Sequence, residues 1–398
     1  MSAGTEALVD PLILGWLRKS AGFTVDQVAH RLKKDKEFIF ASERGEVSLT
    51  IGQVRDLADL YKRALSDFFL PTPPKESALP HDFRRLPGEV AGTYSPKLIR
   101  ELKTARDRRD VALDLFNSMD QTVPSLTAKL NSGADPESAG ELIRRVLKVS
   151  ISDQLTWGDG AGAYKAWRAL IRNAGVLVFQ FDTVPEDEVL GFSLSDRPLP
   201  VVGVSVKQTE NRRTFTILHE FVHVLMQESS VCDIDDFQPR NPTEMAVEVF
   251  CNASAAAALM PKSDFLNHSV VRNHRQRSNW SDTEISEAAR DFGVSRFALV
   301  RRLLTLNLTT RDFYAQKQAQ YTAEYKSLKA AQREKNADKE FRRSYSDRAV
   351  HNLDHSFIRS VLQGYHSRQL TLLDASNLLD VRPERVKEVE VKLTRAAG

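Results

Sequence analysis

The sequence is poor in cysteine, and this excludes a fold held together by disulfides. Only two of its 398 residues are cysteine, Cys232 and Cys251, and no Cys-x-x-Cys pair is present. A disulfide framework needs more cysteines, so a reducing compartment is the natural expectation. The chain is long enough to bury a substantial core without such cross-links.

Long apolar runs and a strong charge of one sign are also lacking. No apolar stretch approaches the roughly 18 residues that span a bilayer. The short apolar run near the start has no basic leader, so it does not have the pattern of a signal peptide. The net charge is only +3, so any basic surface for a nucleic acid must be local. We therefore expect a cytoplasmic protein with no membrane segment.

Turn-forming residues and changes of periodicity divide the chain into four parts. We expect a helical unit at 8–70, a proline-rich linker at 71–95, a larger domain at 96–310 and a charged, then helical module at 311–398. Within the larger domain, three short segments rich in β-formers are predicted strands, at 175–179, 189–194 and 200–206. The fold class expected is α+β, mostly helical, with a small sheet.

The last of these segments suggests a role as well as a structure. The stretch Pro200–Val206 is apolar and bounded by turn residues. If it lies at the edge of the sheet, it can align an extended peptide by adding it as a further strand.

The motif that carries chemistry is His219-Glu220-Phe221-Val222-His223, set in an otherwise apolar stretch. On a helix, residues four apart share a face, so His219 and His223 can bind one Zn²⁺. Glu220 follows the first histidine directly and is placed to take a proton from a metal-bound water. Burial of such polar groups is unfavourable unless a ligand satisfies them. The sequence therefore predicts one catalytic zinc ion, with Glu220 as general base; manganese or iron is the alternative metal.

A catalytic zinc needs a third protein ligand, and the downstream sequence offers several carboxylates. These are Asp233, Asp235, Asp236, Glu244 and Glu248. Glu248 is favoured because the small residues of its predicted helix, at about 242–259, allow close approach to the histidine helix. Asn252 lies one turn later and is predicted to orient Glu248 or a histidine without binding the metal itself.

Four other residues are candidates for which the ordinary interpretation is preferred. Cys232 and Cys251 are interpreted as small buried apolar residues rather than thiolate ligands. His268 and His274 lie in a basic segment and are interpreted as surface residues, with contact to a substrate as the alternative.

Two stretches together resemble the ImmA/IrrE family of metallopeptidases. FTILHEFVHVLM is followed, after a spacer, by EVFCNASAAAALMP, in which Glu248, Asn252 and the Met260-Pro261 end fit the second motif of that family. The similarity extends to the DFRRLPG segment at 82–88 and covers roughly residues 80–310. Where many relatives carry a phenylalanine and an acidic residue, this chain has Ser254 and Ala257.

This resemblance implies a fold, a site and a substrate class. It implies a zincin-like peptidase domain in which His219, His223 and Glu248 hold zinc and Glu220 is catalytic. It also implies a protein substrate, a transcriptional repressor whose cleavage controls gene expression.

Residues 11–70 resemble the Xre/Cro type of helix-turn-helix domain. The matching stretches are LRKSAGFTVDQVAHRL and SERGEVSLTIGQVRDLADLYKRALSDFFLP. In that motif the second helix, here about Lys36–Glu43, enters the major groove of double-stranded DNA. The basic residues expected near phosphates are Lys33, Lys34, Lys36 and Arg44.

Two features of this region weaken the case for DNA. Lysine stands at the turn position that usually holds glycine, and Glu37, Phe38, Phe40 and Glu43 are poorly suited to contact base edges. The alternative is a helical unit that docks on the peptidase domain or on a partner repressor.

Two functions of different classes follow from these residues. The first is a zinc-dependent endopeptidase, fused to a helix-turn-helix unit, that cleaves a regulatory protein. The second is a DNA-binding regulator or antitoxin-like protein whose metal fold only senses or binds. The intact Glu220 favours the first, because a binding fold has no need of a general base. The role of 311–398 stays open between substrate recognition, sensing and dimerisation.

Overall fold

The computed structural model describes residues 5–74, 81–82, 94–131, 133–232, 242–274, 279–337 and 344–397. The chain divides into two compact units, one of Met1–Leu79 with Val90–Thr104 and one of Pro80–Glu89 with Ala105–Gly398. The predicted division at residue 310 falls inside the second unit, and most of the predicted linker at 71–95 lies outside the described residues.

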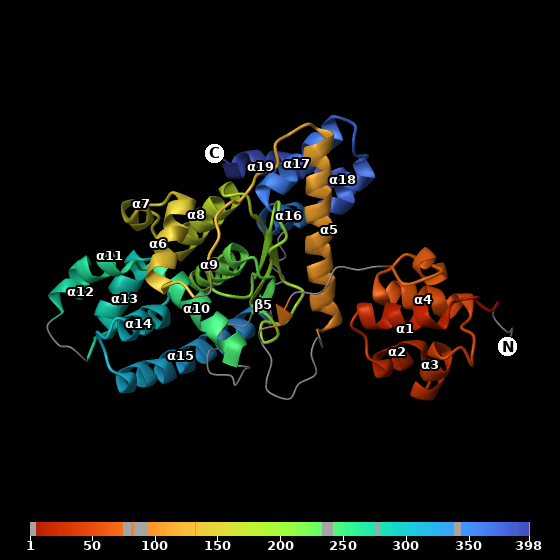
Figure 1. The fold of residues 1–398 in the computed structure, drawn as a ribbon, viewed down its shortest axis with the longest axis horizontal. Helices are drawn as coiled ribbons and strands as arrows, with labels where there is room; N and C mark the ends of the chain where they lie inside the picture. Colours follow the sequence, from red (N-terminus) through yellow and green to blue (C-terminus); the bar gives the residue numbers. More distant parts are fainter. Residues whose placement is uncertain are drawn as a thin grey trace. The chain divides into compact units, whose positions relative to one another are not determined.

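The N-terminal unit is built from short helices with well-defined ends (Figure 1). Thr24 and Thr50 each form a capping box at the start of a helix, which satisfies amide groups that the helix leaves open. Lys33, with φ of 52°, ends the second helix in the left-handed conformation. The elements are α1 (Pro11–Ser20), α2 (Val25–Leu32), α3 (Lys36–Glu43), α4 (Ile51–Tyr61) and the 3₁₀ helix η1 (Leu65–Phe69).

The second unit contains the sheet and the remaining helices. Before and within the sheet lie α5 (Pro96–Ser118, shared between the units), α6 (Pro136–Leu147), α7 (Ile151–Leu155), α8 (Gly160–Asn173), α9 (Glu210–Met226) and the strands β1 (His81–Asp82), β2 (Leu177–Phe181), β3 (Gly191–Leu194), β4 (Val201–Ser205) and β5 (Ser230–Cys232). After the sheet come α10 (Pro242–Leu259), α11 (Lys262–Asn267), α12 (Ser269–Asn273), α13 (Asp282–Asp291), α14 (Arg296–Thr305), α15 (Arg311–Ala337), α16 (Tyr345–Asn352), α17 (His355–His366), α18 (Leu372–Leu378), η2 (Pro383–Arg385) and α19 (Val386–Ala397).

The fold is α+β and mostly helical, as the sequence predicts. The three predicted strands are present as β2, β3 and β4, whereas the short β1 and β5 were not anticipated. The strand order is β1-β5-β3-β4-β2; β2 pairs parallel with β4, and β3 pairs antiparallel with both β4 and β5. The prediction that 200–206 is an edge strand is wrong, because β4 is hydrogen-bonded on both sides and offers no free edge.

Side chains alternate across the sheet, so each face packs on different helices. Val178, Val202 and Val204 join the large apolar core with α8 and α9. On the other face, the ring of Phe179 meets Phe357 of α17 edge to face at 5.6 Å. Burial on both faces explains why these strands are apolar along their whole length.

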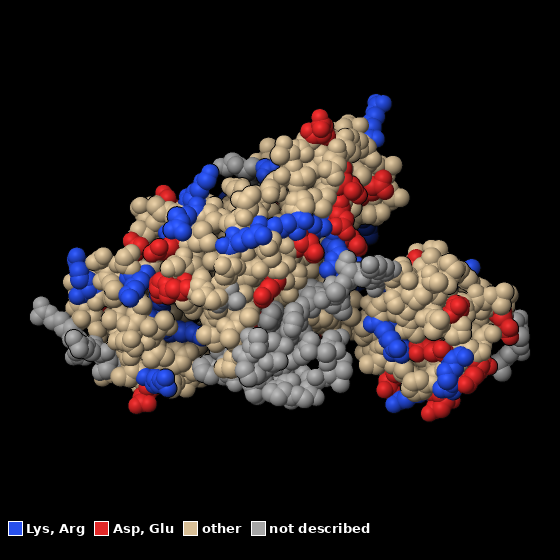
Figure 2. All heavy atoms as spheres, viewed as in Figure 1, with Lys and Arg blue, Asp and Glu red and all other residues tan. Residues whose placement is uncertain are grey.

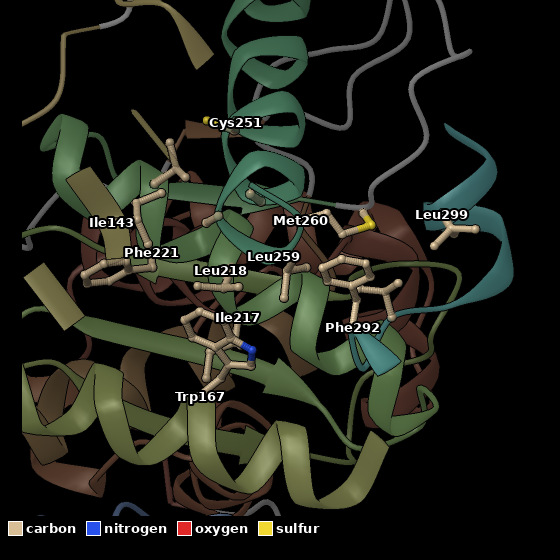
Figure 3. Packing of buried hydrophobic residues seen from close by; sticks show 14 of the residues in the cluster. Ile143, Trp167, Ile217, Leu218, Phe221, Cys251, Leu259, Met260, Phe292 and Leu299 are labelled. Carbon is tan, nitrogen blue, oxygen red and sulfur yellow. The ribbon is translucent and has the colours of Figure 1, made fainter. Parts of the chain in front are cut away.

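The helix α9 lies in the middle of the larger core. Figure 3 shows Ile217, Leu218 and Phe221 of α9 among Trp167 and Leu259, from the helices on either side. All of these side chains are buried. Polar groups carried by such a helix are therefore removed from water together with it.

The small residues of α10 were expected to allow close packing on the histidine helix, α9. The structure shows that they also allow close packing on α6. A methyl group added at Gly140 of α6 would lie 2.7 Å from the backbone of Ala257. The alanines therefore let α10 approach α6 as well as α9, and a larger residue in place of Ala257 would have no room there.

Within the second unit, the helices from α15 onward pack against the rest of the unit at two places. Phe313, Tyr314 and Tyr321 of α15 belong to the same core as α14. The outer side of β2 is covered by the turn between α16 and α17: the Val178 amide donates to the Asp354 carboxylate at 3.2 Å, and Arg168 donates to the carbonyl oxygens of Val178 and Leu353.

Across the described ranges, none of the helices is both long enough and apolar enough to cross a bilayer.

Candidate metal centre

The helix α9 places two histidines and a glutamate in the core. It begins after Thr209 and ends at Gln227, which adopts the left-handed conformation. Because its apolar side chains face the sheet, α8 and α10, the helix is enclosed on nearly all sides, and His219, Glu220 and His223 are fully buried. The local sequence thus puts charge-bearing groups where water cannot solvate them.

Two facing helices bring the three predicted ligands together. The Nε2 atoms of His219 and His223 lie 3.3 Å apart. From α10, Glu248 directs one carboxylate oxygen to within 3.1 Å of His223 Nε2 and the other to within 3.4 Å of His219 Nε2. Among the described residues, this is the cluster of histidine, cysteine and acidic side chains whose spacing suits a metal ion.

The separations fit a tetrahedral zinc ion. With bonds of about 2.0–2.1 Å, the ligand atoms of such an ion lie about 3.3–3.4 Å apart. The separations of 3.1, 3.3 and 3.4 Å are close to that value. Lone pairs that face one another at such distances repel, so a proton or a cation is needed between them.

The shifts in the pKa values of His219 and Glu248 also indicate that the cluster favours positive charge. Burial alone would lower the pKa of His219, but the charge and hydrogen bond of Glu248 outweigh it and leave that pKa raised. Burial would raise the pKa of Glu248, yet the two histidines hold it well below its ordinary value. The three groups together therefore favour a cation at the point where they converge.

Asn252 lies behind the metal-facing side of His219. Its Oδ1 is 2.8 Å from Nδ1 of His219, and its side chain is buried. If Nδ1 carries the proton, it donates to the amide oxygen, which leaves Nε2 with a free lone pair for the metal. This contact restrains both the tautomer and the tilt of the ring.

Glu220 is held on the sheet side of the same helix. Its Oε2 accepts a hydrogen bond from Ser230 of β5 at 2.7 Å. Burial raises the pKa of Glu220 above its ordinary value, although both histidines and Ser230 oppose the shift. A carboxylate whose proton affinity is raised accepts a proton more readily, which is what a general base must do.

Of the remaining candidate ligands, Cys251 has a described side chain, and it is not part of the cluster that suits a metal ion. Burial raises the pKa of the Cys251 thiol well above its usual value, and its Sγ points to Met226 Sδ at 3.8 Å. Asp233, Asp235 and Asp236, and the side chains of Cys232 and Glu244, lie outside the described residues.

The interpretation of His268 and His274 as surface residues is wrong. Their side chains are only 10% and 8% exposed, and they contact Asp291 and Glu284. The ring of His274 also stacks on Trp280. Both histidines thus have structural neighbours of their own.

The basic residues predicted for DNA contact lie on the surface of the N-terminal unit, close to acidic residues. Lys36 pairs with Asp26 at 2.6 Å, Arg44 pairs with Glu46 at 2.6 Å, and Lys34 lies over the ring of Phe38. On the face of this unit that Figure 2 shows, basic and acidic residues are interspersed. Part of the positive charge at the turn is therefore neutralised locally.

Sequence reasoning missed the sheet residues around Glu220. Ser230 and Ser193 are fully buried and contact each other, and Gly191 lies against the Glu220 side chain. No local motif marks them, because their meeting depends on which strands pair. The register of β3 with β5 is the signal that reveals them.

One part of the chain matches the model of a known protein family. Residues 172–304 match the family model Peptidase M78, the IrrE N-terminal-like domain. This range runs from before β2 to the last turn of α14, and it contains both histidines, Glu220, Glu248 and Asn252. The resemblance seen in the two sequence motifs is thereby confirmed for this region.

The chain's similarity to a solved structure is weak. No curated protein has a significant match to it. A solved structure, a Mycobacterium tuberculosis transcriptional regulator, is similar at 16% identity over 49% of this chain and 51% of that one, with a TM-score of 0.30. The chain thus spans about half the length of that protein, and a likeness this weak carries no argument about fold or function.

Proposed function

We propose, from the match of residues 172–304 to a peptidase family, that this protein is a zinc-dependent endopeptidase whose substrate is a regulatory protein of the repressor type. The observation that carries the proposal is the convergence of His219, His223 and Glu248 on one buried point, with Glu220 one residue from a ligand. The repressor as substrate rests on the family resemblance alone.

The residues present would divide the chemistry among them. His219, His223 and Glu248 would hold zinc, and Asn252 would keep the His219 ring oriented. Zinc, when bound, supplies Lewis acidity that makes a water molecule easier to deprotonate. Glu220 accepts a proton from the attacking water and afterwards gives it to the nitrogen of the leaving amine, so that the peptide bond is replaced by an acid and an amine.

The buried position of the centre adds a requirement. His219, Glu220 and His223 are fully buried, so a polypeptide must displace covering groups before it reaches them. The proposal therefore includes an opening step that precedes cleavage.

A comparison of the zinc-loaded protein with its Glu220→Gln variant tests this function. Both are incubated with a peptide pool made by digesting a bacterial proteome, and new peptide ends are read by mass spectrometry. We expect cleavage by the wild type and a loss of about 10²- to 10⁴-fold in the variant, because a general base contributes that much to the rate. The zinc content should be equal in the two proteins. Cleavage of the same bonds at the same rate by the variant would show that Glu220 is not the base.

The second candidate function, DNA binding by the N-terminal unit, has one specific observation in its favour. The helices α2 and α3 are joined by only three residues, and the first of these, Lys33, is in the left-handed conformation. A tight turn of this kind between two short helices is what a helix-turn-helix motif requires. Cleavage of a repressor and binding near its operator are compatible in one chain.

A further inference from the structure

The sheet presents a short chain of hydroxyl groups to the carboxylate of Glu220. Ser230 of β5 donates to Glu220 Oε2 at 2.7 Å, and the hydroxyl of Ser193 on β3 lies 2.7 Å from that of Ser230. All three side chains are fully buried. Because water does not reach them, these groups must find their hydrogen-bond partners in one another.

The direction of this chain follows from counting protons. Each serine has one hydroxyl proton to donate. Since Ser230 gives its proton to the carboxylate, it can only accept from Ser193. Both hydroxyl groups therefore point their protons toward Glu220, and each strengthens the next as a donor to the anionic form.

The strand register produces this arrangement. Ser193 and Ser230 stand directly opposite each other in the antiparallel pair of β3 and β5. Gly191 lies two residues before Ser193, so it faces the same helix, α9. A shift of one residue in either strand would turn these groups to the other face of the sheet.

Gly191 provides the space that the carboxylate occupies. A methyl group at this position would lie 2.8 Å from Glu220 Oε1 and 3.0 Å from its Cγ. The carboxylate therefore has one oxygen fixed by Ser230 and the other beside a residue without a side chain. Among the described residues, Oε1 has no hydrogen-bond partner.

We propose that Ser230, oriented by Ser193, is a positioning residue that holds Glu220 Oε2 and leaves Oε1 to receive the proton of the reaction. This rests on the proposed peptidase function. In the step concerned, an O–H bond of the attacking water breaks and an O–H bond forms at Oε1, while the hydrogen bond to Oε2 keeps the carboxylate from rotating away. Both serines act through Glu220, so we expect their removal to change the rate of the chemical step rather than binding.

A second serine pair on the same two segments offers a matched control. The hydroxyls of Ser195 and Ser229 lie 3.0 Å apart, and Ser229 also accepts from the Ser195 amide. This pair is one residue from Ser230 and two from Ser193, yet within the described part of the chain its hydrogen bonds do not include Glu220. Loss of the Ser229 hydroxyl should disturb the strands about as much as loss of the Ser230 hydroxyl, without loosening the base.

The experiment compares the zinc-loaded wild type with Ser230→Ala, Ser193→Ala, Ser230→Thr and Ser229→Ala. The substrate is a synthetic copy of the peptide that the wild type cleaves fastest in the pool. For Ser230→Ala we expect kcat to fall about 10- to 100-fold, as when a hydrogen bond to a charged group is removed, with KM and zinc content unchanged. Ser193→Ala should have a smaller effect of the same kind. Ser230→Thr keeps a hydroxyl and should recover most of the rate, whereas Ser229→Ala should remain within about 2-fold of wild type.

Crystal structures of the zinc-loaded wild type and Ser230→Ala supply a measurement that does not depend on activity. We expect the Glu220 carboxylate to keep its contact with Ser230 in the wild type and to rotate in the variant. An unmoved carboxylate together with a wild-type kcat overturns the positioning role and leaves the peptidase function intact. A moved carboxylate in a protein that cleaves nothing refutes the peptidase function and retains the contact only as a structural one. An equal drop of kcat in Ser229→Ala also overturns the proposal, because the effect would then come from the strands.

Discussion

Polar side chains are buried at the metal centre, whereas those of the N-terminal unit that were predicted to contact DNA are exposed to water. At the centre, His219, His223 and Glu248 are buried and direct their lone pairs at one another. On the N-terminal unit, Lys36 and Arg44 have acidic partners at 2.6 Å, but their side chains are 54% and 58% exposed. Exposed ion pairs of this kind are screened by water and contribute little to stability.

This difference between buried and exposed clusters indicates which of them requires a bound ligand. The N-terminal charges are already solvated, so their arrangement is compatible with several roles and demands none of them. The buried groups are unstable as neighbours unless a cation joins them. Burial, rather than the type of residue, is what makes the metal centre the stronger inference of the two.

The largest expected effect is on the metal centre itself. In Glu248→Ala, one of three ligands is removed, and the affinity for zinc should fall by more than about 100-fold, beyond the effect of removing an outer partner. The measurement is the zinc content and zinc titration of the purified protein. Glu228→Ala, an exposed residue just after α9, is the control and should bind zinc as the wild type does. Absence of metal from the wild type, even after zinc is added, would contradict the centre and favour the DNA-binding regulator.

A smaller effect is expected one step away from the ion. Asn252→Ala removes the acceptor that faces His219 Nδ1, so the ring can rotate or adopt the other tautomer. We expect the zinc dissociation constant to rise about 10- to 100-fold. Ser254→Ala, also buried on α10, should leave it unchanged. Equal zinc affinity in wild type and Asn252→Ala would mean that the histidine is oriented by the helix packing alone.

On the N-terminal unit we expect a weaker and salt-dependent effect. If the turn binds phosphates, the full-length protein should bind a duplex at low salt, and Lys33→Ala with Lys34→Ala should reduce the slope of log Kd against log salt by about 0.9 for each phosphate that is no longer neutralised. Lys36→Ala and Arg44→Ala should change it less, because Asp26 and Glu46 already neutralise those charges. If duplex DNA is not bound even at low salt, the unit has another partner.

The smallest effect expected is on the stability of the N-terminal unit. Lys33 has φ of 52°, which glycine adopts without strain, so Lys33→Gly should stabilise the unit by about 0.5 kcal/mol once the entropy of the unfolded glycine is included. The check is slower hydrogen exchange of the amides in α2 and α3. Lys34→Gly is the matched control and should destabilise the unit, since Lys34 has no positive φ and packs on Phe38. Stabilisation by both variants would show that the left-handed conformation is not the cause.

The sequence predicts well where a feature is local. The helix expected at about Lys36–Glu43 is present as α3, and the spacing of His219 and His223 places both imidazoles on one face of α9. Glu248 could be chosen because its helix carries a second family motif.

Features that depend on distant pairing could not be predicted in the same way. β5 is only three residues long, and the position of β4 inside the sheet depends on strands far away in the chain. The residues around the Glu220 carboxylate, Gly191, Ser193 and Ser230, come together only because β3 pairs with β5. The sequence predicts only a charged, then helical module from residue 311, and it does not predict that Phe313, Tyr314 and Tyr321 at the start of α15 are buried in the main core.

The turn between α16 and α17, in the last part of the chain, covers the outer side of β2. Val178 has both its amide and its carbonyl engaged, by Asp354 and Arg168, on the side of the strand that faces away from β4. Without the segment that begins at α16, the Val178 amide would lose its acceptor and leave an open position at the sheet edge, to which a strand of another molecule can add. The turn between α16 and α17 thus covers this side of the sheet, and we expect a chain shortened before α16 to form insoluble oligomers whatever its zinc content.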